Sequence, residues 1–119
     1  MLYVESLTGL LIFSLLLQVD LGHIKRLSQI ATQCRSDRHY QQCVSSYYVY
    51  VKSYVNDDFT PVCSHQNCPQ LFTGNEATDN NELVVVNTFD WLLVARYVRL
   101  NPQTWTTGIV LRWELYGCE

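Results

Sequence analysis

The chain has 119 residues, of which 48% are apolar and 16% are charged, with a formal net charge of −3. This length corresponds to about one domain, and a composition so rich in apolar residues excludes a disordered chain. The charge is too small and of the wrong sign for a surface that holds phosphates, so nucleic acid is excluded as an expected partner. Eight tyrosines and three tryptophans favour strands over helices.

Residues 1–16 form an apolar N-terminal segment that differs from the rest of the chain. The run Leu7–Leu17 is too short to span a bilayer, which requires about twenty residues, but it has the length of a signal-peptide core. Glu5 stands where such a peptide carries a basic residue, and no small-x-small cleavage site precedes Gln18. The alternatives are an apolar helix or strand that packs on the domain, or a non-homologous start. Any helix is expected only in this segment.

From Gln18 onward the sequence predicts short strands separated by turns. The stretch from Val19 to Ile30 indicates a strand, a tight turn at Gly22 and a second strand. Strands are also predicted at Tyr47–Tyr54, Val94–Leu100 and Ile109–Tyr116, and Leu83–Val86 is a short apolar run. Pro102 is expected to end the strand at Val94–Leu100. Loops are predicted at Gln33–Cys43, Pro61–Pro69 and Gly74–Glu82, and a turn at Asn56–Asp58.

Alternation with a period of two assigns the faces of the last predicted strand. Ile109, Leu111, Trp113 and Leu115 fall on one face, and Val110, Arg112, Glu114 and Tyr116 on the other. The residues predicted to be buried are Val19, Val98, Leu111, Trp113 and Leu115.

Five cysteines in so short a chain indicate an oxidising compartment. Cys34 and Cys43 bracket one polar loop, and Cys63 and Cys68 bracket another, so the simplest pairing closes each loop by its own disulfide. The alternative is a zinc site that also uses His39 or His65, although zinc ligands are usually spaced more tightly. By count, Cys118 is expected to be an unpaired thiol.

No catalytic constellation accompanies the three histidines, since the chain has neither a Gly-x-Ser-x-Gly elbow nor a His-Glu-x-x-His motif. We therefore expect no catalytic residue and no enzymatic activity. The run from Asp79 to Glu82 offers oxygen ligands of the calcium type but lacks EF-hand spacing, so a solvated loop is the default. No metal and no cofactor is assigned.

Three arginines on predicted strands, Arg96, Arg99 and Arg112, could bind anions. We instead expect them to pair with carboxylates such as Glu114 or Asp90 at the edge of the core.

Several motifs together resemble the discoidin domain, also called the coagulation factor V/VIII type C domain. They are Gln18–Gly22 (QVDLG), Ile30–Gln33 (IATQ), followed by Cys34 where the family has glycine, Phe72–Asn75 (FTGN), Ala95–Leu100 (ARYVRL), Thr104–Trp105 and Leu111–Cys118 (LRWELYGC). They occur in family order and at family spacing from about Leu17 to Cys118. The resemblance implies an all-β, eight-stranded jelly-roll sandwich.

The resemblance also implies where the chain departs from a complete domain. Such a domain opens with further strands, two ligand loops and a cysteine that bonds the closing cysteine, and none of these is found in residues 1–16. Residues 17–119 are therefore expected to be a partial domain, incomplete at its N-terminus, with Cys118 lacking that partner. The sheet edge normally closed by the opening strand is expected to be uncovered unless Leu7–Leu17 replaces it.

Family members are non-catalytic binding modules of secreted and cell-surface proteins, and they use loops at one end of the sandwich. The loop between Cys34 and Cys43 corresponds to one of these ligand loops. Its arginines and tyrosine favour a carboxylate, sulfate or glycan ligand, whereas the lack of Trp, Leu or Phe at its tip disfavours lipid. The expected ligand-loop residues are Arg35, Ser36, Asp37, Arg38, His39 and Tyr40.

The expected function is therefore extracellular cell adhesion or ligand recognition. The partners implied are an extracellular glycan, a matrix protein such as collagen, a cell-surface protein, or an anionic phospholipid membrane surface. Two alternatives stay open: a carbohydrate-binding accessory module of a larger enzyme, and a non-functional truncated fragment.

Overall fold

The computed structural model describes residues 2–6, 17–36, 41–76, 83–109 and 111–118, and these contain strands but no helix. The strands are β1 (Leu2–Ser6), β2 (Leu17–Ser36), β3 (Gln41–Lys52), β4 (Thr60–Pro61), β5 (Phe72–Thr73), β6 (Val84–Thr106) and β7 (Leu111–Cys118). The all-β prediction is confirmed. Of the alternatives left open for the N-terminal segment, Leu2–Ser6 is a strand, and residues 7–16 lie outside the described residues.

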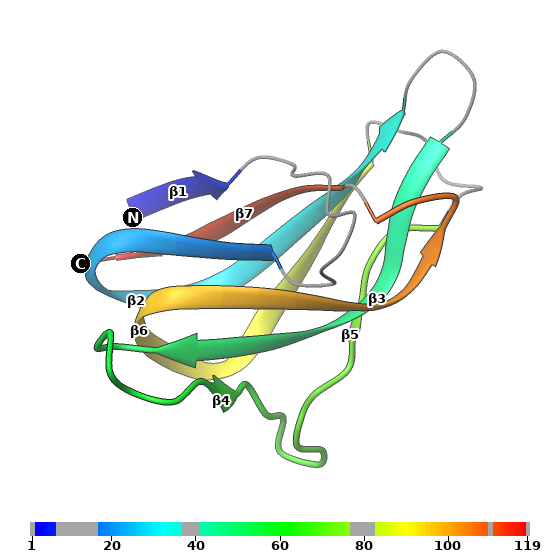
Figure 1. Ribbon diagram of the computed structural model, residues 1–119. Helices are drawn as coiled ribbons and strands as arrows, with labels where there is room; N and C mark the ends of the chain where they lie inside the picture. Colours follow the sequence, from blue (N-terminus) through cyan, green and yellow to red (C-terminus); the bar gives the residue numbers. More distant parts are fainter. Residues whose placement is uncertain (1, 7–16, 37–40, 77–82, 110, 119) are drawn as a thin grey trace.

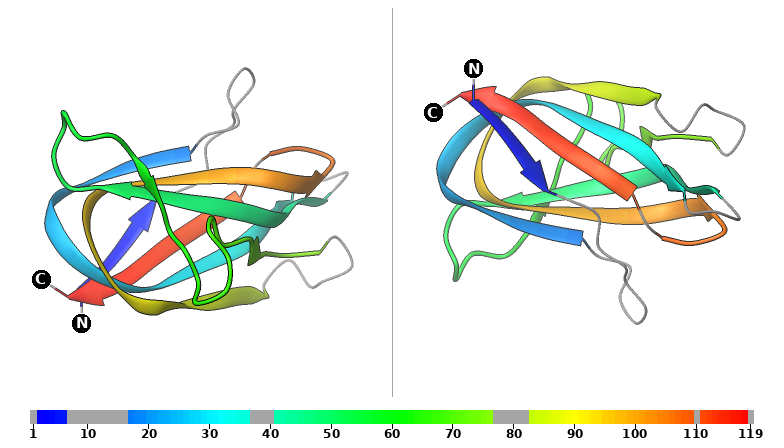
Figure 2. Two further views of the ribbon diagram at one scale, coloured as in Figure 1. Left: turned by 90° about the horizontal axis from the view of Figure 1, so that it is seen from below. Right: turned by 90° about the horizontal axis from the view of Figure 1, so that it is seen from above.

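The strands form two facing layers, and the long strands β2 and β6 bend so that each contributes to both (Figures 1 and 2). The first layer contains β1, β7, the C-terminal half of β2 and the N-terminal half of β6. The second layer contains the other halves of β2 and β6, together with β3, β4 and β5. All described pairings are antiparallel, and this is a jelly-roll-like β-sandwich.

The bend of β2 replaces the predicted turn. A register shift separates the pairing of Asp20 from that of Lys25, and Gly22 between them has φ of +84°, a backbone conformation that glycine adopts without strain. The Gly22 amide donates a hydrogen bond of 2.8 Å to the Asp20 carboxylate. The two strands predicted on either side of Gly22 are therefore a single bent strand.

The predicted end of a strand before Pro102 is wrong, because β6 continues through it to Thr106. Proline cannot donate a ladder hydrogen bond, but Pro102 lies opposite Tyr47, where β3 has a register shift between Ser46 and Tyr47. The extra residue at this shift is Gln103 of β6, so the pairing is irregular directly beside Pro102, where the donor is missing. The short apolar run Leu83–Val86 and the predicted strand Val94–Leu100 consequently belong to one strand.

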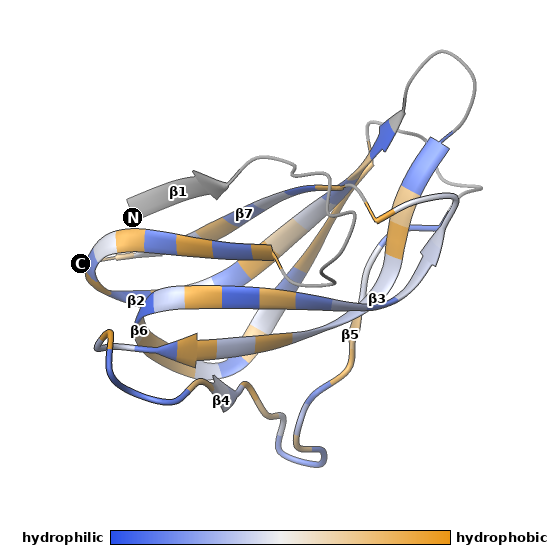
Figure 3. Ribbon diagram, in the orientation of Figure 1, coloured by the Kyte–Doolittle hydropathy of each residue, from blue (hydrophilic) through white to orange (hydrophobic). Residues whose placement is uncertain are grey.

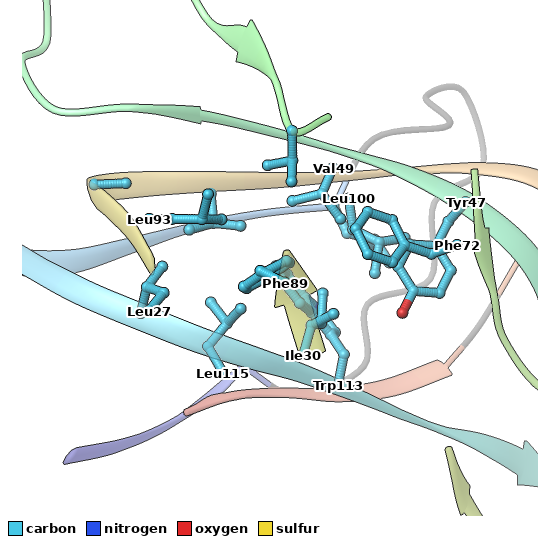
Figure 4. Packing of buried hydrophobic residues seen from close by; sticks show 14 of the residues in the cluster. Leu27, Ile30, Tyr47, Val49, Phe72, Phe89, Leu93, Leu100, Trp113 and Leu115 are labelled. Carbon is cyan, nitrogen blue, oxygen red and sulfur yellow. The ribbon is translucent and has the colours of Figure 1, made fainter. Parts of the chain in front are cut away.

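Alternation places the core between the layers, as the hydropathy colours along β3, β6 and β7 show (Figure 3). Leu111, Trp113 and Leu115 are buried while Arg112, Glu114 and Tyr116 are not, as predicted, and Val98 is also buried. Val19 is only partly buried. In Figure 4, Trp113, Leu115, Ile30 and Leu27 of the first layer face Tyr47, Val49 and Leu100 of the second, with Phe72 and Phe89 between them.

The outer edge of β7 is covered by β1, in a register that pairs Leu2 with Gly117 and Ser6 with Trp113. We expected the sheet edge normally closed by the opening strand to be uncovered unless Leu7–Leu17 replaced that strand. The segment that pairs with β7 is instead Leu2–Ser6, five residues earlier.

Candidate binding site

Three connections meet at one end of the sandwich: β2 to β3, β5 to β6, and β6 to β7 (Figure 1). The pairings of the flanking residues show this directly, since Cys43 lies opposite Thr106 and Cys34 lies opposite Leu111. The bends of β2 and β6 and the described chain ends lie at the opposite end (Figure 2). We refer to the end with the three connections as the loop end.

The disulfide between Cys34 and Cys43 joins β2 to β3 at the base of the predicted ligand loop. It is formed as predicted, with a Cα–Cα distance of 4.5 Å, and both residues are buried. Beyond it the strands continue for two more pairs, Arg35 with Gln42 and Ser36 with Gln41. The predicted loop Gln33–Cys43 is therefore shorter than expected, because a disulfide and a two-stranded ladder fix its ends.

Among the predicted ligand-loop residues, Arg35 and Ser36 are the last two residues of β2. Asp37, Arg38, His39 and Tyr40 lie outside the described residues. Their assignment as ligand contacts stays a prediction. The described part establishes that Arg35 is placed on a strand end directly after a buried disulfide.

Asn75 connects the bases of two of the loops, and it is 1% exposed. Its side-chain carbonyl accepts a hydrogen bond of 2.9 Å from the Thr32 hydroxyl of β2, and its amide donates one of 3.1 Å to the carbonyl of Leu83. Its backbone amide donates to the Val44 carbonyl at 2.9 Å. One buried side chain thereby holds β2 and the start of β6 together across the connection between β5 and β6.

Gly74 allows this approach, because a Cβ there would collide with the backbone carbonyl oxygen of Val44. The sequence identified Phe72–Asn75 only through family resemblance. The structure gives the physical role of each position: Phe72 is core, Gly74 permits close backbone contact, and Asn75 supplies the hydrogen bonds. The polar pattern alone did not reveal that Thr32 is the partner of Asn75.

A hollow of about 140 Å³ lies near the loop end on the first layer. The register places Ala31 and Gln33 beside Glu114 and Arg112 on one face, with Val84 opposite Gln33. The small Ala31 side chain leaves space between longer neighbours. Sequence reasoning did not find this hollow, since nothing in the pattern marks Ala31 as anything other than a strand residue.

The second disulfide, Cys63–Cys68, is also formed as predicted, with a Cα–Cα distance of 4.5 Å. Its loop packs on the side of the sandwich: the His65 amide donates to Asp90 at 2.8 Å, and the His65 ring meets Trp91 edge-on at 5.2 Å. Since all four cysteines are bonded in pairs, the zinc alternative has no thiolate ligands. The possible calcium ligands from Asp79 to Glu82 lie outside the described residues.

Arg96 pairs with a carboxylate as expected, but the partner is Asp20 rather than Glu114 or Asp90. The expectation of a carboxylate partner is wrong for Arg99. Arg96 donates to both carboxylate oxygens of Asp20, at 2.7 and 3.0 Å, and Arg99 donates to the side-chain oxygen of Gln18, at 3.2 and 2.9 Å. The reason is the strand order, which places β2 beside this half of β6. The hydrogen bonds from Arg96 and the Gly22 amide lower the pKa of Asp20.

The described residues contain no group of three or more metal-ligating side chains. They also include no helix that is long and apolar enough to cross a membrane.

Comparison with known proteins identifies the family. The F5/8 type C domain model matches residues 15–115, so the chain belongs to the F5/8 type C, or discoidin, domain family. Human neuropilin-1 is 37% identical over 105 residues, which cover 87% of this chain and 11% of that protein. Rat lactadherin is 40% identical over 104 residues, which cover 86% of this chain and 23% of that protein. The chain therefore spans a small fraction of these relatives.

Among solved structures, discoidin II of Dictyostelium discoideum has a TM-score of 0.73 at 26% identity and covers 87% of this chain and 37% of that one. A chitosan-binding module from Paenibacillus has a TM-score of 0.54 at 20% identity, over 86% of this chain and 67% of that one, which shows a shared fold only. The family's domain is a non-catalytic binding module.

Proposed function

We propose that this chain is an extracellular, non-catalytic module that binds a glycan or a matrix or cell-surface protein through its loop end. The observation that carries the proposal is the brace formed by the Cys34–Cys43 disulfide and Asn75, which fixes the bases of two loops on the sandwich. Fixing loop ends in advance lowers the ordering cost of binding. Arg35, at the foot of the first loop, supplies a cation suited to carboxylate or sulfate groups.

The two disulfides favour an oxidising compartment, which supports secretion or display at the cell surface. Membership of the discoidin family supports binding rather than catalysis. An accessory module of a larger enzyme would share all these features, and the complete transcript distinguishes that alternative by the presence of a catalytic domain.

The test is a glycan array and a panel of matrix proteins, probed with the wild-type chain and with the double variant Arg35→Ala/Arg38→Ala. We expect the variant to lose binding by tenfold or more, since charged hydrogen bonds contribute about 1.5–3 kcal/mol each. Arg26→Ala is a matched control, because Arg26 is an exposed cation at the bend of β2, away from the loop end. Unchanged binding by the double variant would place the site elsewhere.

An anionic membrane is the second candidate, and exposed apolar residues at the loop end favour it. Leu83 and Trp105, beside two of the loops, are 44% and 41% exposed. Apolar tips with basic neighbours are what membrane attachment requires. Liposomes with and without phosphatidylserine, mixed with wild type and Trp105→Ser, separate the two candidates: only membrane binding would need both the anionic lipid and Trp105.

A further inference from the structure

The outer face of the second layer carries an ordered set of cations and aromatic rings that the loop end does not use. Register places Gln18, Arg99 and Tyr50 in one row across β2, β6 and β3, and Asp20, Tyr97 and Lys52 in the next. Their neighbours along each strand, among them Val49, Val98 and Leu100, point into the core. These two rows therefore face outward.

The cations lie over the rings in an interleaved stack. The Arg99 guanidinium carbon is 3.9 Å from the centre of the Phe59 ring, and the Lys52 ammonium is 4.8 Å from the same centre. The Lys52 ammonium is also 5.2 Å from the Tyr97 ring centre, and the Arg96 guanidinium carbon is 5.1 Å from that same centre. Because Lys52 and Arg99 share one ring, their charges lie within about 9 Å of each other and repel.

Only one of these three cations has a carboxylate partner in the part of the chain that the structure describes. Arg96 is paired with Asp20. Arg99 donates to the neutral side chain of Gln18, and Lys52 donates to the backbone carbonyl of Val55. The nearby turn acid Asp57 accepts instead from the amide of Tyr54. Guanidinium has five donors and ammonium three, so both Arg99 and Lys52 keep donors for a ligand.

We propose that this face, centred on Lys52, Phe59 and Arg99, is a second binding site that takes a sulfated glycan. A sulfate group placed between Lys52 and Arg99 would accept hydrogen bonds from both and would relieve their repulsion. The adjoining rings of Tyr48 and Tyr50, 6.5 Å apart, supply apolar faces for sugar rings beside Gln18 as a polar partner. Such a surplus of cations stands out on a chain whose net charge is −3.

The test is binding to immobilised heparin over a range of salt, using the full chain. Lys52→Gln and Arg99→Gln should each weaken binding by about tenfold, the effect of one charged hydrogen bond, and the double variant should bind no measurable heparin at physiological salt. Hyaluronan, which carries carboxylates but no sulfate, should bind at least tenfold more weakly than heparin. Thermal unfolding of each variant establishes that the fold is retained.

The matched control is the double variant Arg26→Gln/Arg112→Gln. It removes the same charge from two exposed residues on β2 and β7, which pair in the first layer. It should change heparin binding by no more than about twofold. Equal losses in both double variants would mean that net charge alone attracts heparin, and the proposal fails. If Lys52→Gln/Arg99→Gln keeps full heparin binding but unfolds at a lower temperature, the two cations serve only to pack Phe59, and the proposal fails. Loss in Arg35→Ala/Arg38→Ala instead would assign sulfated glycans to the loop end.

Discussion

At the scale of single residues, Asn75 connects two segments at the base of the proposed site. It is buried, and both of its side-chain groups have partners on different segments, the Thr32 hydroxyl and the Leu83 carbonyl. Removing the amide would take one partner from the buried Thr32 hydroxyl, which also hydrogen-bonds Tyr47, and would leave the Leu83 carbonyl without this hydrogen bond. Buried polar groups left in this state cost about 1–3 kcal/mol each.

We therefore expect Asn75→Ala to lower the free energy of unfolding by about 2–4 kcal/mol. Asn101→Ala is the matched control, since Asn101 lies on the outer face opposite Tyr48 and is partly exposed. Urea unfolding of both variants checks the prediction. Equal, small effects would show that Asn75 does not brace the loops.

Tyr47 gives a prediction on pH. Burial raises the pKa of Tyr47 to about 12, and a hydrogen bond from Asn87 opposes this only in part. The folded state thus keeps this proton after the unfolded chain, with a pKa near 10, has lost it. Stability contributed by neutral Tyr47 is complete below pH 10 and is lost as the pH rises from 10 through 12, at up to about 1.4 kcal/mol per pH unit.

In Tyr47→Phe this contribution is absent. The variant should therefore lose less stability than wild type between pH 10 and 12, as measured by urea unfolding at a series of pH values. Parallel curves for the two proteins would mean that Tyr47 ionises in the folded state as easily as in the unfolded chain.

At the scale of elements, sequence patterns identified which segments are strands better than where the strands end. The faces of Leu111–Tyr116 follow from alternation alone, because one side of that strand is buried and the other is not. Alternation in the sequence did not predict that β2 and β6 are long, unbroken strands. Gly22 and Pro102 are usually breakers, and only tertiary register shifts allow strands to pass through them. Likewise, the partners of Arg96 and Arg99 depend on strand order, which no local pattern contains.

The Cys34–Cys43 disulfide is the element that closes the loop end. Its replacement by Cys34→Ala/Cys43→Ala should lower the free energy of unfolding by about 2–3 kcal/mol, mostly because the unfolded chain regains freedom. The Cys63–Cys68 disulfide closes a shorter loop, so Cys63→Ala/Cys68→Ala should lower the free energy of unfolding slightly less. Calorimetry of the two double variants tests the order. Glycan binding should fall in the first variant and stay unchanged in the second, because only the first loop is at the loop end.

At the scale of the whole molecule, Cys118 is a free and exposed thiol at the end of β7. Under oxidising conditions we expect disulfide-linked dimers, formed when two Cys118 thiols lose two protons and two electrons to glutathione disulfide. Mass spectrometry without reductant should show them in wild type and not in Cys118→Ser. A monomer with Cys118 bonded to another cysteine of the same chain would contradict the pairing described here.

The two long bent strands also determine how the molecule unfolds. Because β2 and β6 each run through both layers, we expect that neither layer opens while the other stays intact. Amide hydrogens of Ile30 in one layer and Leu100 in the other should therefore exchange with solvent through the same global opening, with one common free energy of opening. A sandwich whose layers had separate strands would show two classes of exchange, whereas we expect this one to unfold as a single cooperative unit.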